Sequence, residues 1–93
     1  MDIRNRSKVY VAVIAEFDEN GRIRPTSLVW ENGRRYEIDK VTDIRPAAAM
    51  RAGGLGDRYT VWINGRSSYL FFERCVSLTG NNIGRWFVER RGA

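Results

Sequence analysis

The sequence predicts a mostly-β protein of about six antiparallel strands, with at most one short helical turn near residues 46–52. Two observations lead to this prediction. Apolar and polar residues alternate over several short segments, which is the period of a strand with one buried face. Three Asn-Gly-Arg tripeptides separate such segments, and Asn-Gly favours a hairpin because both residues tolerate the positive φ of a type I′ turn. The tripeptides are Asn20-Gly21-Arg22, Asn32-Gly33-Arg34 and Asn64-Gly65-Arg66.

The first strand is expected over Lys8–Phe17, where Val9, Val11 and Val13 share one face. The other face carries Tyr10 and further apolar residues. Because side chains alternate between the two faces of a strand, this pattern indicates a strand that is covered on both sides.

The next two strands are expected over Ile23–Glu31 and Arg35–Ile44. Pro25 weakens the early part of the first, because proline cannot donate a hydrogen bond to the ladder. In the second, clean alternation gives way to a shifted phase. The shift predicts a bulge or bend near Lys40.

Pro46 opens a different kind of segment. The alanine-rich residues 47–52 are helix-prone, proline is allowed in a first helical turn, and the glycines of residues 53–56 would end a helix. We expect a short helical turn or a mobile loop over residues 46–57. Strands then resume at Arg58–Asn64, Ser67–Glu73 and Arg85–Arg90.

A sheet of six strands in a chain of 93 residues must curl, because strands twist and free edges invite aggregation. We therefore expect a strongly curled sheet or a small, partly open barrel of SH3-like or OB-like type. The length favours a single β domain over residues 1–93, with a disordered N-terminus at residues 1–7.

The chain is basic, with a net charge of +5, and its cations are fourteen Arg and two Lys. Arginine makes planar, bidentate contacts to phosphate and stacks on bases, so this bias points to nucleic acid or another polyanion. A genome rich in G and C would produce the same bias without any selection for binding. Composition alone leaves both explanations open.

The cysteine content favours a cytoplasmic protein. Cys75 is the single cysteine, so the chain cannot form an internal disulfide, on which small secreted domains usually depend. The apolar run Val9–Ala15 follows basic residues, as in a secretory signal, but acidic residues end it at once and it is too short to span a bilayer. We therefore expect no membrane partner.

The residue types present argue against an enzyme. The chain has no histidine, which excludes the usual hydrolase triads and histidine-containing zinc sites. Glu37 and Asp39 share a strand face, but such carboxylates more often pair with neighbouring arginines than bind a cation. Gly53–Gly56 lacks the Gly-Lys-Ser/Thr ending of a phosphate loop. We expect no catalytic residue, no metal and no cofactor.

Arginines beside aromatic residues in the second half of the chain form the most suggestive pattern. Single-strand binders combine aromatic platforms for bases with cationic grooves for phosphates, although aromatic residues in a small β domain more often form its core. Trp62 is the best exposed candidate, because it falls opposite the apolar face of its strand. The candidate nucleic-acid-binding residues are Arg58, Trp62, Arg66, Arg85, Arg90 and Arg91.

The alternative function is a protein-interaction domain that docks on a larger partner or forms a homodimer. It would use an exposed edge strand and the Pro46–Gly56 segment. Salt dependence separates the two, because binding to nucleic acid releases counterions and an apolar edge contact does not.

Four segments carry a recognisable pattern: Trp30-x-x-Gly33-Arg34-x-Tyr36-x-Ile38-x-x-Val41, Arg58-Tyr59-Thr60-Val61, Tyr69-Leu70-Phe71-Phe72-Glu73 and Arg85-Trp86-Phe87-Val88-Glu89-Arg90. Together, from Leu28 to Arg91, they resemble a family of small bacterial proteins with an SH3-like β domain. Some members of that family are encoded near genes of Y-family translesion DNA polymerases. The resemblance implies an SH3-like fold and an accessory role around DNA damage, and it supplies no activity and no site.

Overall fold

The computed structural model describes residues 6–47, 56–74 and 83–91, which form seven β-strands and no helix. The mostly-β prediction is confirmed. One strand more than expected is present because the segment expected as a single strand over Arg35–Ile44 is divided into two. The strands are β1 (Arg6–Phe17), β2 (Ile23–Val29), β3 (Arg35–Glu37), β4 (Lys40–Pro46), β5 (Gly56–Ile63), β6 (Arg66–Arg74) and β7 (Gly84–Arg91).

The segments expected to be irregular are partly strand. β1 already begins at Arg6, and the ladder between β4 and β5 extends to the pair Pro46 and Asp57. The rest of the expected N-terminal disorder, residues 1–5, and of the expected helical turn or loop, residues 48–55, lies outside the described residues.

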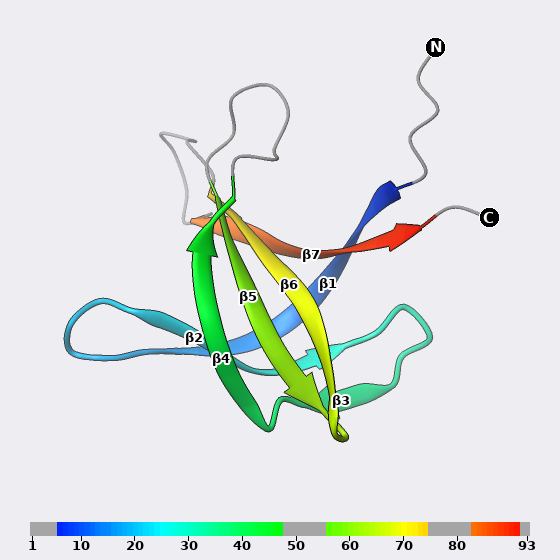
Figure 1. The fold of residues 1–93 in the computed structure, drawn as a ribbon, viewed down its shortest axis with the longest axis horizontal. Helices are drawn as coiled ribbons and strands as arrows, with labels where there is room; N and C mark the ends of the chain where they lie inside the picture. The colour runs from blue at the N-terminus through cyan, green and yellow to red at the C-terminus, as the bar shows by residue number, and fades with distance from the viewer. Residues whose placement is uncertain (1–5, 48–55, 75–82, 92–93) are drawn as a thin grey trace, which may run out of the picture.

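All seven strands belong to one antiparallel sheet in the order β3-β2-β1-β7-β6-β5-β4. Two meanders of three consecutive strands, β1–β3 and β4–β6, are joined side by side through β7, which pairs with β1 and with β6. Figure 1 shows β4, β5 and β6 running steeply across β1 and β2, so that the sheet coils into a half-barrel.

The chain changes direction sharply at Ile38–Asp39, so that one continuous segment forms both edge strands of the sheet, β3 and β4. The Ile38 N–H donates to Thr26 O of β2 at 2.9 Å, and the next N–H, that of Asp39, donates to Trp62 O of β5 at 2.7 Å. A register shift between Val41 and Asp43 follows within β4. The bulge or bend expected near Lys40 is therefore confirmed, with one irregularity on each side of it.

The three Asn-Gly-Arg tripeptides each join two paired strands, as predicted. The turn type differs from the expectation at two of them. Asn64 and Gly65 have φ of 53° and 80°, as a type I′ turn requires, whereas at the other two turns only Gly21 and Gly33 have positive φ. Those longer turns are closed by backbone hydrogen bonds, such as that from Trp30 N–H to Arg34 O at 2.8 Å. Side chains add to them, since Asp18 Oδ1 accepts the N–H of Arg22 at 2.9 Å.

The sheet buries apolar side chains on both faces. The inner face, enclosed by the half-barrel, holds the main core. The opposite, outer face holds a smaller cluster of Phe71 and Phe87 with Ala47 packed against it. Double burial is why β6 is apolar at consecutive positions, with Leu70 facing in and Phe71 facing out. The buried residues of the main core are Leu28, Tyr59, Val61, Leu70, Phe72 and Trp86.

Candidate nucleic-acid interface

The strand register places aromatic and basic side chains together on the outer face. Tyr10 of β1 lies opposite Phe87 of β7, Phe87 opposite Phe71 of β6, and Phe71 opposite Arg58 of β5. Directly opposed residues point to the same side of a sheet, so these four form one row across four strands. With the neighbouring rows they make up the aromatic–basic face, defined as Lys8, Tyr10, Lys40, Arg58, Trp62, Tyr69, Phe71, Glu73, Arg85 and Phe87.

The floor of the aromatic–basic face is a stack of two phenylalanines. The rings of Phe71 and Phe87 are parallel within 5°, with centroids 5.0 Å apart, and both are buried. Tyr10 meets Phe87 edge-on at 5.8 Å, and Tyr69 meets Phe71 edge-on at 6.5 Å. The stack fixes the two tyrosines, which are 41% and 51% exposed and stand at the surface.

Each exposed tyrosine carries a guanidinium group on its ring. Arg85 lies 4.0 Å from the ring centroid of Tyr10, and Arg58 lies 4.3 Å from that of Tyr69. Both distances are within the range of cation–π attraction, which contributes about 0.5–1 kcal/mol at an exposed site. Lys8 over Phe87 at 4.8 Å and Lys40 over Trp62 at 5.1 Å repeat the arrangement.

Three of these cations form no ion pair within the described part of the chain. Arg58, Arg85 and Lys40 contact aromatic rings instead. Arg58 Nε is also buried without a hydrogen-bond acceptor among the described residues. The aromatic–basic face therefore holds four cations and one carboxylate, that of Glu73, which lies opposite Arg85 and interacts with its charge.

Glu73 is an acidic residue within the aromatic–basic face. Its Oε1 accepts the Tyr10 hydroxyl at 2.9 Å and lies 3.5 Å from Lys8 Nζ. Burial raises the pKa of Glu73, but the hydrogen bond from Tyr10 and the charge of Lys8 outweigh burial, so the pKa lies below its ordinary value of 4.5. Glu73 is consequently ionised at neutral pH, and it holds Lys8 and Tyr10 over Phe87.

The structure brings together three of the six candidate residues and separates the others. Arg58, Trp62 and Arg85 share the aromatic–basic face. Arg66 pairs with Ile63 and so points toward the opposite side. Arg90 also points that way, toward Glu31, with which it forms an ion pair. Arg91 closes β7, and its side chain lies outside the described residues.

The sequence analysis missed the contributions of Lys8 and Tyr10 to this surface, whereas Tyr69 belongs to the pattern of arginines and aromatic residues in the second half of the chain. A signal for Tyr10 was present, since it occupies the second apolar face of its strand. Its proximity to Arg85 depends on the pairing of β1 with β7, which are far apart in the chain.

The carboxylates considered as cation ligands are engaged elsewhere. Glu37 pairs with Arg35 at 3.3 Å, and Asp39 Oδ2 accepts the N–H of Asn64 at 3.1 Å. In the described ranges, no group of three acidic or sulfur-bearing side chains is arranged to hold a metal ion.

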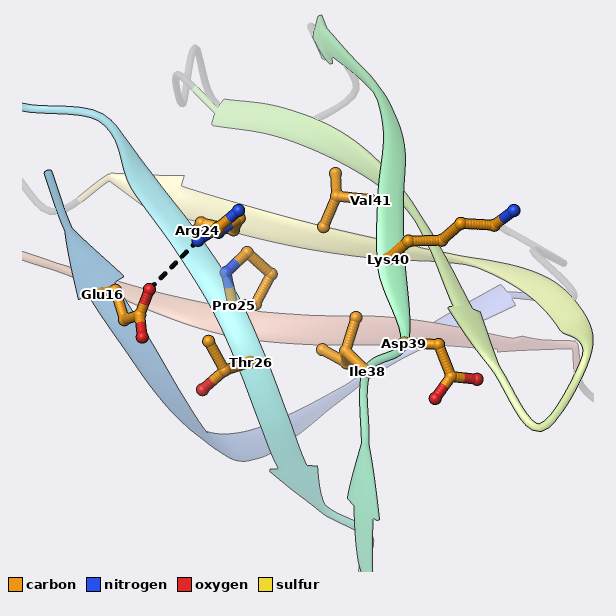
Figure 2. Close-up of a pocket in the computed structure, with 8 residues that line it drawn as sticks. All are labelled: Glu16, Arg24, Pro25, Thr26, Ile38, Asp39, Lys40 and Val41. Carbon is orange, nitrogen blue, oxygen red and sulfur yellow. Dashed lines mark hydrogen bonds and ion pairs between the residues drawn. The ribbon is translucent and has the colours of Figure 1, made fainter.

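A groove of about 390 Å³ opens on another side of the molecule, where β2 and β4 diverge from the corner at Ile38 (Figure 2). Pro25, Ile38 and Val41 supply apolar lining, and an ion pair between Glu16 and Arg24 spans its rim at 3.2 Å. Its charges are of both signs, so the groove lacks the positive bias of the aromatic–basic face.

The fold and site together define an open β half-barrel with a cationic, aromatic outer surface. No protein-family model matches this chain, and no curated protein or solved structure is significantly similar to it. Among the described residues, no helix is long and apolar enough to cross a bilayer. The likeness to the bacterial SH3-like family therefore stays a prediction.

Proposed function

We propose that this protein is a non-enzymatic module that binds single-stranded nucleic acid through the aromatic–basic face. One observation carries the proposal: two exposed tyrosines lie on one face of the sheet, and each has over its ring an arginine that forms no ion pair in the described chain. Proteins that bind single strands combine these elements, using rings for the bases and cations for the backbone.

The geometry of the tyrosines favours single strands over duplexes. Tyr10 and Tyr69 belong to β1 and β6, which flank β7, so about 10 Å separates them across the sheet. Exposed tyrosine rings can stack with bases that have left a helix, as in proteins that recognise single strands. The described residues form no helix that would enter a duplex groove.

The arginines are oriented for phosphate before any ligand arrives. A guanidinium group has five N–H donors around its planar edge, which can bind a phosphate while the group contacts a ring. Arg58 and Arg85 are already held over tyrosine rings, at 4.3 and 4.0 Å from the centroids, which lowers the conformational entropy lost on binding. The net charge of +5 adds long-range attraction for any polyanion.

The test is the affinity of the protein for a fluorescent single-stranded oligonucleotide, measured by anisotropy over a range of salt concentrations. The affinity should fall with salt, and Arg85→Ala should lower the logarithmic salt slope by about 1. Tyr69→Ala should weaken binding by about 1–3 kcal/mol through the loss of one stacked base. A salt slope near zero, or no binding at low salt, would overturn the proposal.

Two further variants separate charge from position. Arg58→Lys keeps the charge but loses the planar, multi-donor guanidinium group that lies over Tyr69, so it should keep the salt slope while binding more weakly. Arg34→Ala removes a cation from the β2–β3 turn, away from the aromatic–basic face, and should change the affinity little. An equal loss in Arg34→Ala and Arg85→Ala would show only a general effect of net charge.

The second candidate function is a homodimer formed by pairing the free edge of β4 with that of a second copy. Among the described residues, β4 pairs with β5 alone, and Ile44 on it is 53% exposed. Arg45 and Pro46 on the same strand are residues that native edges use to prevent such pairing, which places this function second. Light scattering should show a dimer that Ile44→Lys abolishes if the edge is the interface.

A further inference from the structure

Glu73 places a negative charge on the surface that we propose to bind a polyanion. It is opposite Arg85 in the β6–β7 ladder and accepts a hydrogen bond from Tyr10, the ring on which Arg85 lies. Its side chain is 21% exposed, so the carboxylate is within reach of solvent at the edge of the proposed stacking platform.

One oxygen of this carboxylate is still available as an acceptor. Oε1 takes the contacts from Tyr10 and Lys8, while Oε2 makes no hydrogen bond or ion pair with the described residues. A carboxylate oxygen accepts hydrogen bonds and cannot donate them when it is ionised. Oε2 therefore presents a pure acceptor next to the Tyr10 hydroxyl, which Oε1 of the same carboxylate contacts.

Such an acceptor discriminates between the bases. The exocyclic amino group of cytosine donates to a carboxylate, whereas thymine and uracil place a carbonyl oxygen at the same ring position. The two kinds of pyrimidine stack on a ring with similar area, so stacking alone separates them little. A base on Tyr10 with an amino group would satisfy Oε2, and one with a carbonyl oxygen would be repelled by it.

We propose that Glu73 is a specificity-determining residue that selects an amino-bearing base, such as cytosine, over thymine or uracil at the position beside Tyr10. This inference rests on the proposed single-strand function and adds a base preference to it. Tyr10 and Lys8 act as positioning residues, because they fix Oε1 and thereby orient Oε2.

The experiment compares oligodeoxycytidine with oligothymidine of equal length, at neutral pH and near-physiological salt, by fluorescence anisotropy. The unmodified protein should bind the cytidine oligomer about 5- to 100-fold more tightly, the range of one good base contact. Glu73→Gln should bring the ratio of the two affinities close to one, because the amide can donate to a carbonyl as well as accept from an amine.

Glu37→Gln is the matched control, because it removes the same charge from β3, outside the aromatic–basic face. It should leave the affinity ratio unchanged, and amide spectra confirm that both variants stay folded. Tight, salt-dependent binding of both oligomers with a ratio near one would overturn the base preference while the proposed function stands. A ratio that persists in Glu73→Gln would also overturn the preference, and no binding of either oligomer would overturn both inferences.

Discussion

Gly84 begins β7 at a point where the backbone passes close to a buried ring. A Cβ atom placed there would lie 2.4 Å from Phe72 Cζ and 2.7 Å from the carbonyl oxygen of Glu73. Both contacts are shorter than atoms tolerate, and the second involves backbone that cannot rotate away. The smallest residue is therefore required here for steric reasons, and its φ is not in the left-handed region.

Gly84→Ala should lower the free energy of unfolding by about 1–3 kcal/mol, the usual effect of overpacking a filled core. Chemical denaturation followed by Trp fluorescence measures the change. Ser68→Ala, at an exposed site on β6, is the control and should leave the stability nearly unaltered. Equal stability of Gly84→Ala and the unmodified protein would contradict the packing described around Phe72.

Asp18 closes the first turn through its carboxylate. The hydrogen bond from the Arg22 N–H lowers the pKa of Asp18 from its ordinary value of 3.8. Desolvation opposes this effect, and the hydrogen bond from the Asn20 N–H adds to it. A lowered pKa in the folded state stabilises the protein above pH 3.8, and this contribution disappears as the pH falls through the folded-state pKa. Carboxyl carbon shifts recorded against pH should place the inflection of Asp18 below 3.8, and a higher value would show that the turn is open.

The strands and the three hairpins could be predicted from the sequence because their signals are local. Alternation gave the strands, and each Asn-Gly-Arg tripeptide marked a hairpin. The division of one expected strand into β3 and β4 could not be predicted, because it follows from the two partners that bind Ile38 and Asp39. The same limit applies to the aromatic–basic face, where the contact of Tyr10 with Glu73 joins residues far apart in the chain.

One side chain also links β5 and β2, the strands next to the two edge strands of the sheet. The Tyr59 hydroxyl of β5 donates to the Ile23 carbonyl of β2 at 2.8 Å, across the interior of the half-barrel. This hydrogen bond connects elements that are not neighbours in the sheet. It therefore holds the curvature of the half-barrel beside the diverging edges of β2 and β4.

Tyr59→Phe should lower the free energy of unfolding by about 1 kcal/mol and speed amide exchange in β2. Tyr69→Phe is the matched control, since the Tyr69 hydroxyl makes no hydrogen bond within the described chain and should be dispensable for stability. Hydrogen exchange followed by NMR measures both. Faster exchange in both variants alike would mean that the hydroxyl of Tyr59 does not hold the curvature.

At the scale of the molecule, β7 is the strand on which the sheet depends. It lies between the meanders β1–β3 and β4–β6, and its register with β1 runs from Arg91 opposite Arg6 to Trp86 opposite Val11. β3, in contrast, is a short edge strand that, in the part of the chain described, pairs with β2 alone. A substitution that breaks the hydrogen-bond ladder should therefore destabilise the protein more in β7 than in β3.

Val88→Pro, in the centre of β7, should unfold the protein, because proline removes a ladder hydrogen bond in a central strand. Arg35→Pro, in the edge strand β3, should leave a folded protein of reduced stability. Far-ultraviolet circular dichroism and amide dispersion distinguish the two outcomes. A folded Val88→Pro variant would show that the two meanders hold together without β7.

The position of β7 also bears on how the protein is made. The ribosome synthesises β7 after the other six strands. Because β7 is the second pairing partner of β1, one flank of β1 stays unpaired until β7 has left the exit tunnel. During that interval the nascent chain exposes the unpaired flanks of β1 and β6, which are templates for pairing with another chain. The aromatic–basic face is likewise incomplete until β7 has been synthesised, because Arg85 and Phe87 belong to that strand.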